Sequence, residues 1–314
     1  MSKPFFSIVI PTYNRASSIA HTLEGCFKQT FEDFEVIVVD DGSSDNTVDV
    51  LSEIKDPRLV VIEQQNAGPA AARNSGAKAA QGRYVAYLDS DDVWYPEFLQ
   101  DAHVELKKTP DVFLYGQIII DRGVGRYWIK PERALGADES LFDFLYVEGG
   151  FIQTSTMIVP KTLCEKVQWN ESITFGDNDQ YAIDCWRTGI PFRMMPRALT
   201  LYADVMTSDA LSQLPIFDAN SEKYTNFFGW MTQQQPFMSD KAWLGFRARF
   251  ESVNLARSKP LSSMGLVFKA YRGNTMGLGG AARQLLQNFA PRLYRKLTNT
   301  YVKYKGVSLQ SIDH

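Results

Sequence analysis

Cysteine is scarce in this sequence of 314 residues, and the three that occur, Cys26, Cys164 and Cys185, have no CxxC spacing. An odd and scattered set supports neither a disulfide framework nor a zinc site, so we expect reduced, partly buried thiols. The chain also lacks the run of about 18 apolar residues that a membrane-spanning helix needs, and no signal-peptide pattern follows Met1. We therefore expect a cytoplasmic protein, which can still lie on the inner face of a membrane.

The common phosphate-binding loops are missing as well. No GxxxxGK[ST] segment occurs, and no GxGxxG follows the first predicted strand. ATPases with a P-loop and dinucleotide-binding dehydrogenases therefore lose their main sequence support. The formal net charge of −3 argues against a dedicated nucleic-acid binder, and we expect no nucleic-acid partner.

Charge is distributed unevenly along the chain. Between Ser252 and Ile312 there are ten basic residues and no acidic one. With Asp313, this tail carries nine net positive charges, so residues 1–251 must carry twelve net negative ones. Such an asymmetry indicates a binding or packing role for the tail.

Strand and helix patterns alternate over the first 120 residues, which predicts an open α/β fold. The apolar, β-branched runs are continuous, as is typical of parallel strands buried on both faces. The predicted strands are residues 6–10, 34–39, 59–62 and 84–88, and the predicted helices are residues 17–28, 46–54 and 70–80. Further strands are expected at 112–120, 153–159 and 192–202, with helices at 139–147 and 178–187. From residue 215 only helices are expected, at 216–232, 240–257, 261–271 and 281–305.

Polar residues cluster where the apolar runs end. Asp40 and Asp41 follow the second predicted strand, and Asp89-Ser90-Asp91 follows the fourth. Because ligands of open α/β sheets bind beyond the carboxyl ends of the strands, this edge is the expected site. Two carboxylates around a small residue suit a hard divalent cation, which substrate phosphates commonly help to hold.

A predicted helix near residue 70 carries Arg73 in its first turns. A helix N-terminus and a guanidinium both attract anions, so Arg73 is expected to face a diphosphate. The alternative is an arginine that covers a helix surface.

Four segments in order carry a family resemblance: residues 7–14 (SIVIPTYN), 38–45 (VVDDGSSD), 66–74 (NAGPAAARN) and 88–92 (LDSDD). Together they resemble the successive motifs of family 2 inverting glycosyltransferases of the bacterial surface-glycan type. The resemblance covers residues 5–205 and implies the GT-A fold, an α/β fold with a mostly parallel central sheet. It implies a glycosyltransferase domain at 1–214, with a nucleotide-sugar-binding half at 1–112 and an acceptor half at 113–214. A helical, basic region follows at 215–314.

The implied activity is metal-dependent, inverting transfer of a sugar from a nucleotide sugar, with UDP as the expected nucleotide. The implied acceptor is a hydroxyl of a glycan or a lipid-linked glycan, and the implied cofactor is Mn²⁺ or Mg²⁺. Two other functions stay open: a catalytically inactive nucleotide- or glycan-binding protein, and a nucleotidyltransferase. The latter would need a glycine-rich loop for triphosphate, and residues 11–17 contain no glycine.

The resemblance also implies roles by position. Asp91 and Asp89 would hold the metal ion, and Asp92 is expected to be a solvated residue at a helix start. In the nucleotide-base pocket, Tyr13 would pack on the base and Asp41 would accept a hydrogen bond from it. The donor-binding residues implied by the motifs are Pro11, Tyr13, Asp40, Asp41, Asn66, Gly68, Arg73, Asp89 and Ser90.

The catalytic base is less clear from the motif. The family usually supplies it from a Glu-Asp pair that opens a helix, and here Asn178 stands at the position of the base. An amide cannot take up a proton in this role. Asp179 and Asp177 are both candidates, with Asp179 preferred. The remaining interpretation is an acidic turn that only caps the helix.

The basic tail contains amphipathic stretches at 283–289 and 292–297, which mix Arg and Lys with Leu, Phe and Tyr. Helices of this kind lie in membrane interfaces and are attracted to anionic lipid. The alternative is a helical extension that packs on the catalytic domain or on a second subunit. The sequence does not define the oligomeric state.

Overall fold

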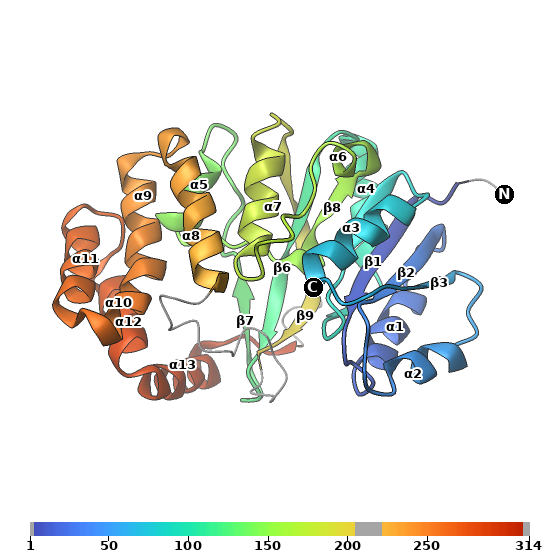
Figure 1. Ribbon diagram of the computed structural model, residues 1–314, viewed down its shortest axis with the longest axis horizontal. Helices are drawn as coiled ribbons and strands as arrows, with labels where there is room; N and C mark the ends of the chain where they lie inside the picture. Colours follow the sequence, from blue (N-terminus) through green and yellow to red (C-terminus); the bar gives the residue numbers. More distant parts are fainter. Residues whose placement is uncertain (1–2, 205–221, 310–314) are drawn as a thin grey trace. The chain divides into compact units, whose positions relative to one another are not determined.

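The apolar N-terminal segments form parallel strands, as their sequence predicts (Figure 1). The computed structural model describes residues 3–204 and 222–309. In it β1 pairs with β2 and with β4, and β2 pairs with β3. The bounds are β1 (Phe6–Thr12), β2 (Phe34–Asp40), β3 (Leu59–Glu63) and β4 (Tyr84–Tyr87). Thr12 lies opposite Asp40, so the polar residues that follow β1 and β2 start from the same edge of the sheet.

The three predicted helices of this half are confirmed as α1 (Ile19–Phe27), α2 (Thr47–Glu53) and α3 (Pro69–Ala79). In α1, Ile19, Leu23 and Cys26 lie at helical spacing and join the apolar core beneath the sheet. Gly76 lets α3 approach β1 closely, because a Cβ at this position would collide with Val9. Pro69 stands at the first helical position, where its missing N–H costs no hydrogen bond.

Antiparallel strands extend the sheet beyond β4. The order is β3-β2-β1-β4-β8-β6-β9-β5, and the β4–β8, β6–β8 and β5–β9 pairs are antiparallel. The bounds are β5 (Val93–Trp94), β6 (Phe113–Asp121), β8 (Ile158–Pro160) and β9 (Phe192–Ala203). The helices of this part are α4 (Phe98–Lys108), α6 (Lys161–Cys164) and α7 (Asp177–Trp186), of which α4 and α6 were not predicted.

The strand predicted over 153–159 is wrong in its first half. Residues Thr154–Thr156 form a short 3₁₀ turn (η1), and the strand begins at Ile158. The Gln153 side chain accepts a hydrogen bond of 2.5 Å from the Ser155 backbone N–H, which offers the backbone a local partner in place of a strand neighbour.

The three cysteines are free and buried, as expected. Burial raises the pKa of each thiol above its ordinary value. These thiols therefore act as small apolar groups in the core.

Contacts divide the chain into two units, which we call the first unit (1–120 and 152–203) and the second unit (121–151 and 204–314). Residues 121–151 thus group with the C-terminal part of the chain, although the division drawn from the sequence places them with the N-terminal domain. The assignment of donor and acceptor halves stays a prediction.

The described part of the second unit is mostly helical. Pro260 and Pro291 stand at the first positions of α11 and α13, so the predicted helix over 281–305 is divided in two. The helix predicted over 216–232 lies partly outside the described residues and is confirmed from Glu222. In the part of the chain that the structure describes, no helix is long and apolar enough to cross a bilayer. The bounds are β7 (Tyr127–Lys130), α5 (Leu141–Tyr146), α8 (Glu222–Gln234), η3 (Gln235–Phe237), α9 (Asp240–Phe246), a π-helical turn η4 (Arg247–Glu251), α10 (Ser252–Ser258), α11 (Pro260–Arg272), α12 (Leu278–Phe289) and α13 (Pro291–Lys305).

Candidate active site

Asn14 joins the loops that follow β1 and β2. Its backbone has a φ of 52°, in the left-handed region that asparagine tolerates better than most residues. Its Oδ1 accepts hydrogen bonds from the backbone N–H groups of Ser44 at 2.8 Å and Asp45 at 3.3 Å. Its own N–H donates to the Ser43 hydroxyl at 2.9 Å. Asn14 therefore fixes the shape of this edge, a role that the motif alone did not indicate.

Asp40 and Asp41 are both buried and both hold loops. The Asp40 carboxylate accepts from the Ser43 backbone N–H at 3.0 Å and from the Ser43 hydroxyl. The Asp41 carboxylate accepts from Gln64 Nε2 at 2.7 Å and from the backbone N–H groups of Ala67 at 2.9 Å and Gly68 at 2.7 Å. Because a carboxylate offers about four acceptor positions, one position on Asp41 remains for a ligand.

Other predicted donor-binding residues differ in exposure. Pro11 is buried within β1, whereas Tyr13 is 47% exposed and Asn66 is exposed. Gly68 has a φ of 92°, and open space surrounds the position of its absent Cβ. The exposed ring of Tyr13 can therefore contact a ligand, and the backbone at Gly68 can be approached closely.

The Asp89-Ser90-Asp91 segment follows β4 as predicted. The Asp89 carboxylate accepts from Arg73 Nη2 at 2.8 Å and from Gln153 Nε2 at 3.2 Å, so both of its oxygens are engaged. Asp91 is half-exposed, and its nearest cation is Arg15, with Nη2 3.5 Å from Oδ2. The surrounding protein partly desolvates Asp91 and the Asp89 charge repels it, and both effects raise its pKa. Ser90 is buried, and its carbonyl accepts from the Ser18 hydroxyl at 3.0 Å.

The expectation that Asp92 is solvated is wrong. Its side chain is buried and accepts hydrogen bonds from the Ser155 hydroxyl at 2.5 Å and Gln153 Nε2 at 3.2 Å. The chain continues from Asp92 into the short strand β5 and not into a helix. Burial, together with the charges of Asp89 and Asp91, raises the pKa of Asp92 well above its ordinary value. Gln153 and Ser155 were missed, although polar residues inside an apolar run are a visible signal of such a role.

Arg73 connects two of the predicted groups. It is 5% exposed, and its Nη2 pairs with Asp89 at 2.8 Å while its Nη1 pairs with Asp177 at 2.6 Å. Its guanidinium carbon lies 4.5 Å from the centre of the Trp169 ring. Burial opposes its charge, but the two carboxylates outweigh this effect and raise its pKa. Arg73 is thus not a surface residue, and its contact with a diphosphate stays a prediction.

Helix α7 begins with the acidic turn that the sequence indicated. Gly176 precedes it with a φ of 71°, a left-handed conformation that favours glycine. Asp177 is held by Arg73, and Asn178 Nδ2 donates to the carbonyl of Ile152 at 2.8 Å. Asp179 lies in the same turn and accepts a long hydrogen bond of 3.4 Å from Asn178 Nδ2. Asp177, one of the two candidate bases, is therefore tied to a buried cation.

We expect Arg73→Met to lower the free energy of unfolding of the first unit by about 3 kcal/mol, because both of its carboxylate partners lose their buried cation. Urea unfolding followed by tryptophan fluorescence would measure this, since Trp169 packs on the guanidinium. Arg58→Met is the matched control: Arg58 also pairs with an aspartate and lies over aromatic rings, but it is 28% exposed and should cost about 1 kcal/mol or less. Equal losses for the two variants would contradict a special role for Arg73.

Within the described residues, no group of three or more His, Cys, Asp or Glu side chains is placed to hold a metal ion. Of the carboxylates that follow β4, Asp89 is engaged with Arg73 and Gln153, and Asp91 is half-exposed. Mg²⁺-type cations are commonly bound through one or two carboxylates with substrate phosphates and water as the other ligands. The donor set fits a cation that arrives with a phosphate-bearing substrate.

Comparison with known proteins matches this picture. The sequence model described as glycosyl transferase family 2 matches residues 7–167. The chain is 28% identical over 253 residues to the amylovoran biosynthesis glycosyltransferase AmsB of Erwinia amylovora, covering 77% of this chain and 82% of that protein. It is 32% identical over 182 residues to the UDP-Glc:alpha-D-GlcNAc-diphosphoundecaprenol beta-1,3-glucosyltransferase WfaP of Escherichia coli, covering 56% and 67%.

Among solved structures, S. aureus TarS in complex with UDP-GlcNAc is similar, with a TM-score of 0.57 at 19% sequence identity. The likeness covers 94% of this chain and 91% of that one. The segment matched by the family's sequence model contains the predicted metal and donor residues but ends before the acidic turn at 177–179.

Proposed function

The chain belongs to glycosyl transferase family 2 and has the GT-A fold, and from that membership we propose that it transfers a sugar from a UDP-sugar to a lipid-linked glycan with inversion at the anomeric carbon. The observation that carries this proposal is the buried Arg73, which pairs with Asp89 after β4 and with Asp177 at the start of α7. One side chain thereby connects the segment after β4, where the diphosphate is expected, to the acidic turn at 177–179, where the acceptor is expected.

The donor pocket is proposed at the ends of β1 and β2. The exposed ring of Tyr13 offers a stacking surface, and the remaining acceptor position of Asp41 can receive a base N–H. Two similar proteins support UDP as the nucleotide, since WfaP is a UDP-Glc glucosyltransferase and the TarS structure is a complex with UDP-GlcNAc. Asp40 would support the pocket through Ser43.

The proposed cofactor is Mn²⁺ or Mg²⁺, held by Asp91 with Asp89 beside it. Asp91 is the better candidate because it is half-exposed, whereas both Asp89 oxygens already accept hydrogen bonds. When bound, the cation would act as a Lewis acid that stabilises the negative charge of the leaving diphosphate. Arg73 would keep Asp89 oriented at this edge.

Asp179 is the proposed catalytic base. The Asp177 carboxylate is paired with the buried Arg73 at 2.6 Å, and it would have to leave this ion pair to reach an acceptor hydroxyl. In the proposed step the acceptor hydroxyl oxygen attacks the anomeric carbon, and its proton passes to Asp179. The bond from that carbon to the diphosphate oxygen breaks, and UDP leaves from the opposite face.

The proposed location follows from the acceptor. A lipid-linked glycan is presented at a membrane surface, so we place the enzyme in the cytoplasm at the inner face of the membrane. The basic charge of residues 252–312 supports this placement.

The alternative is a protein that binds nucleotide or glycan without turnover. Asn178 favours it, because this residue is an amide where the family usually has its base, and it is already bound to the carbonyl of Ile152.

We expect incubation with a panel of nucleotide sugars to give UDP release from a UDP-sugar, at least tenfold faster with Mn²⁺ than with EDTA. Nucleotide binding without release, also in the presence of lipid-linked acceptor extracts, would favour the inactive alternative. Release from all nucleotide sugars alike would contradict the assignment of UDP.

A further inference from the structure

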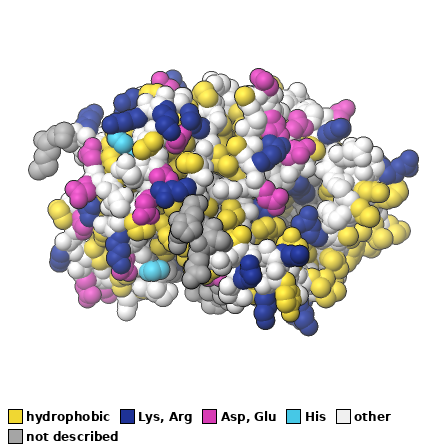
Figure 2. All heavy atoms as spheres, turned by 180° about the vertical axis from the view of Figure 1, so that it is seen from behind, with side chains coloured by type: hydrophobic (Ala, Val, Ile, Leu, Met, Phe, Trp, Pro, Cys, Tyr) yellow, Lys and Arg dark blue, Asp and Glu magenta, His cyan; other side chains and the backbone are white. Residues whose placement is uncertain are grey.

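Helices α11 and α13 of the second unit expose large apolar side chains at helical spacing. In both helices these residues are three or four positions apart, which places them on one face of each helix. Their exposures reach 83% at Leu261 and 72% at Tyr304. Figure 2 shows hydrophobic and basic side chains gathered over this part of the surface. The exposed apolar residues are Leu261, Met264, Phe268 and Tyr271 in α11 and Leu293, Leu297, Tyr301 and Tyr304 in α13.

The attachment of these helices to their unit uses other faces. In α12, the buried Asn288 donates to the hydroxyls of Ser252 at 2.9 Å and Ser263 at 3.1 Å. The segment after α13 is held by backbone hydrogen bonds between Tyr127 and Val307. In α13 the buried residue is Val302. The exposed apolar side chains are therefore not needed to hold the tail in place.

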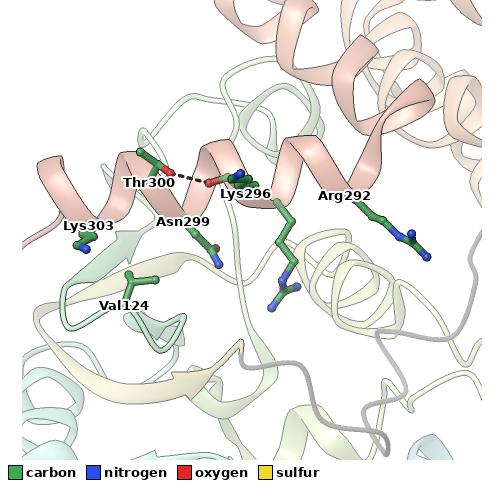
Figure 3. Close-up of a pocket in the computed structure, with 7 residues that line it drawn as sticks. Val124, Arg292, Lys296, Asn299, Thr300 and Lys303 are labelled. Atoms are coloured by element: carbon green, nitrogen blue, oxygen red, sulfur yellow. Dashed lines mark hydrogen bonds between the residues drawn. The ribbon is translucent and has the colours of Figure 1, made fainter.

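A basic pocket of about 430 Å³ runs along α13 (Figure 3). In Figure 3 the side chains of Arg292, Lys296, Asn299 and Lys303 follow one another along the helix. The lining residues include four cations and no carboxylate: Val124, Arg292, Arg295, Lys296, Asn299, Thr300 and Lys303.

One carboxylate does lie close to this pocket. Asp204 pairs with Arg295, whose Nη1 is 3.5 Å from Oδ1, and with Arg122. Arg292, Lys296 and Lys303, in contrast, form no ion pair with any residue that the structure describes. These three cations thus stay available for an anion outside the unit.

The basic and apolar residues of α13 form two adjacent stripes. Each of these cations precedes an exposed apolar residue by one position, which is a rotation of about 100° around the helix. The three pairs are Arg292 and Leu293, Lys296 and Leu297, and Lys303 and Tyr304. Helices that lie in a membrane interface have this arrangement, since long basic side chains can reach phosphates while the neighbouring apolar stripe enters the acyl region.

We propose that this face of the second unit binds an anionic lipid bilayer, with Arg292, Lys296 and Lys303 on lipid phosphates and the apolar stripes of α11 and α13 in the interface. A bilayer is favoured over a protein partner by the charge of the surface, because residues 252–312 contain ten basic residues and no acidic one. The inference deepens the proposed function and rests on it, since it brings the enzyme to the surface that presents a lipid-linked acceptor.

The test is sedimentation of the full chain with vesicles of phosphatidylcholine that contain one third phosphatidylglycerol. We expect the triple variant Arg292→Gln, Lys296→Gln and Lys303→Gln to bind about 100-fold more weakly than the wild type, because each cation near an anionic surface contributes several-fold. The matched control removes the same charge from exposed lysines of the first unit: Lys55→Gln, Lys78→Gln and Lys107→Gln. The control should bind as the wild type does, and vesicles of phosphatidylcholine alone should bind the wild type weakly.

Equal vesicle binding by the triple variant and the control would overturn the proposal. A second variant, Leu293→Gln with Leu297→Gln, tests the apolar stripe. The proposal is supported if this variant binds vesicles more weakly than the wild type and both proteins are monomers. If instead the wild type is a dimer, and this variant is a monomer that binds vesicles as well as the wild type does, the face is an interface between copies. That result would overturn the proposal. UDP release from donor is measured for every variant in the presence of lipid-linked acceptor extracts. If the wild type releases UDP but does not bind vesicles, only the proposed membrane binding is refuted. If the wild type releases no UDP, the proposed function itself is refuted.

Discussion

Asp91→Asn is expected to leave the protein folded and to reduce metal-stimulated UDP release by at least 100-fold, because a metal ion supplies several kcal/mol of charge stabilisation to a leaving diphosphate. The side chain is half-exposed, and the salt bridge recorded for it is a 3.5 Å contact with Arg15. Its removal should therefore cost little stability. Turnover would be measured as UDP release over a Mn²⁺ titration, and folding by the thermal transition.

Asp49→Asn is the matched control for this variant. It also replaces an exposed carboxylate of the first unit, but it lies on α2. We expect its Mn²⁺ titration to overlay that of the wild type. If Asp91→Asn kept the same stimulation by Mn²⁺ as this control, the metal site would have to lie elsewhere.

The strand ends could be predicted because the physics that fixes them is local. Apolar, β-branched runs form the buried strands, and the polar residues that follow must emerge at the sheet edge, so Asp40, Asp41, Asp89 and Asp91 could be placed there from the sequence. Their partners could not. Asp41 holds the backbone of Gly68, 27 positions further on, and no pattern in either segment encodes that pairing.

The role of Arg73 was beyond prediction for the same reason. Its second partner, Asp177, lies 104 positions away and is brought near by the tertiary structure of the first unit. Asp92 was misplaced because its burial depends on Gln153 and Ser155 from another segment. Sequence patterns indicate which side chains carry charge, but the pairing of those charges is decided by tertiary structure.

The acidic turn at 177–179 shows what the sequence could predict and what only the structure adds. The sequence located it at the start of a helix and identified Asn178 as a departure from the family's pattern. The structure adds one observation about the two remaining carboxylates, because it shows that Asp177 is bound to the buried Arg73 at 2.6 Å. This pairing lets Asp177 position Arg73, and it supports the proposal that Asp179 accepts the proton.

Asp179→Asn should therefore lower kcat by about 10³-fold, within the range that general base catalysis contributes, and leave UDP binding unchanged. Asp177→Asn should instead destabilise the first unit, because Arg73 loses one of its two carboxylates, and its loss of kcat should be smaller. Steady-state kinetics with saturating donor and acceptor, together with UDP titration by calorimetry, would separate the two effects.

The double variant Asp179→Asn with Asn178→Asp decides between a shifted base and the family's usual register. If Asp179 is the base because of its own position in the turn, moving the carboxylate by one residue rotates it by about 100° around the helix and should restore little activity. If the double variant instead recovers kcat to within tenfold of the wild type, residue 178 faces the acceptor. The native enzyme would then work with a base that is displaced from the family's usual position. A large loss of kcat in Asp177→Asn at unchanged stability, with Asp179→Asn fully active, would assign the proton transfer to Asp177 and require the Arg73 pair to open during turnover.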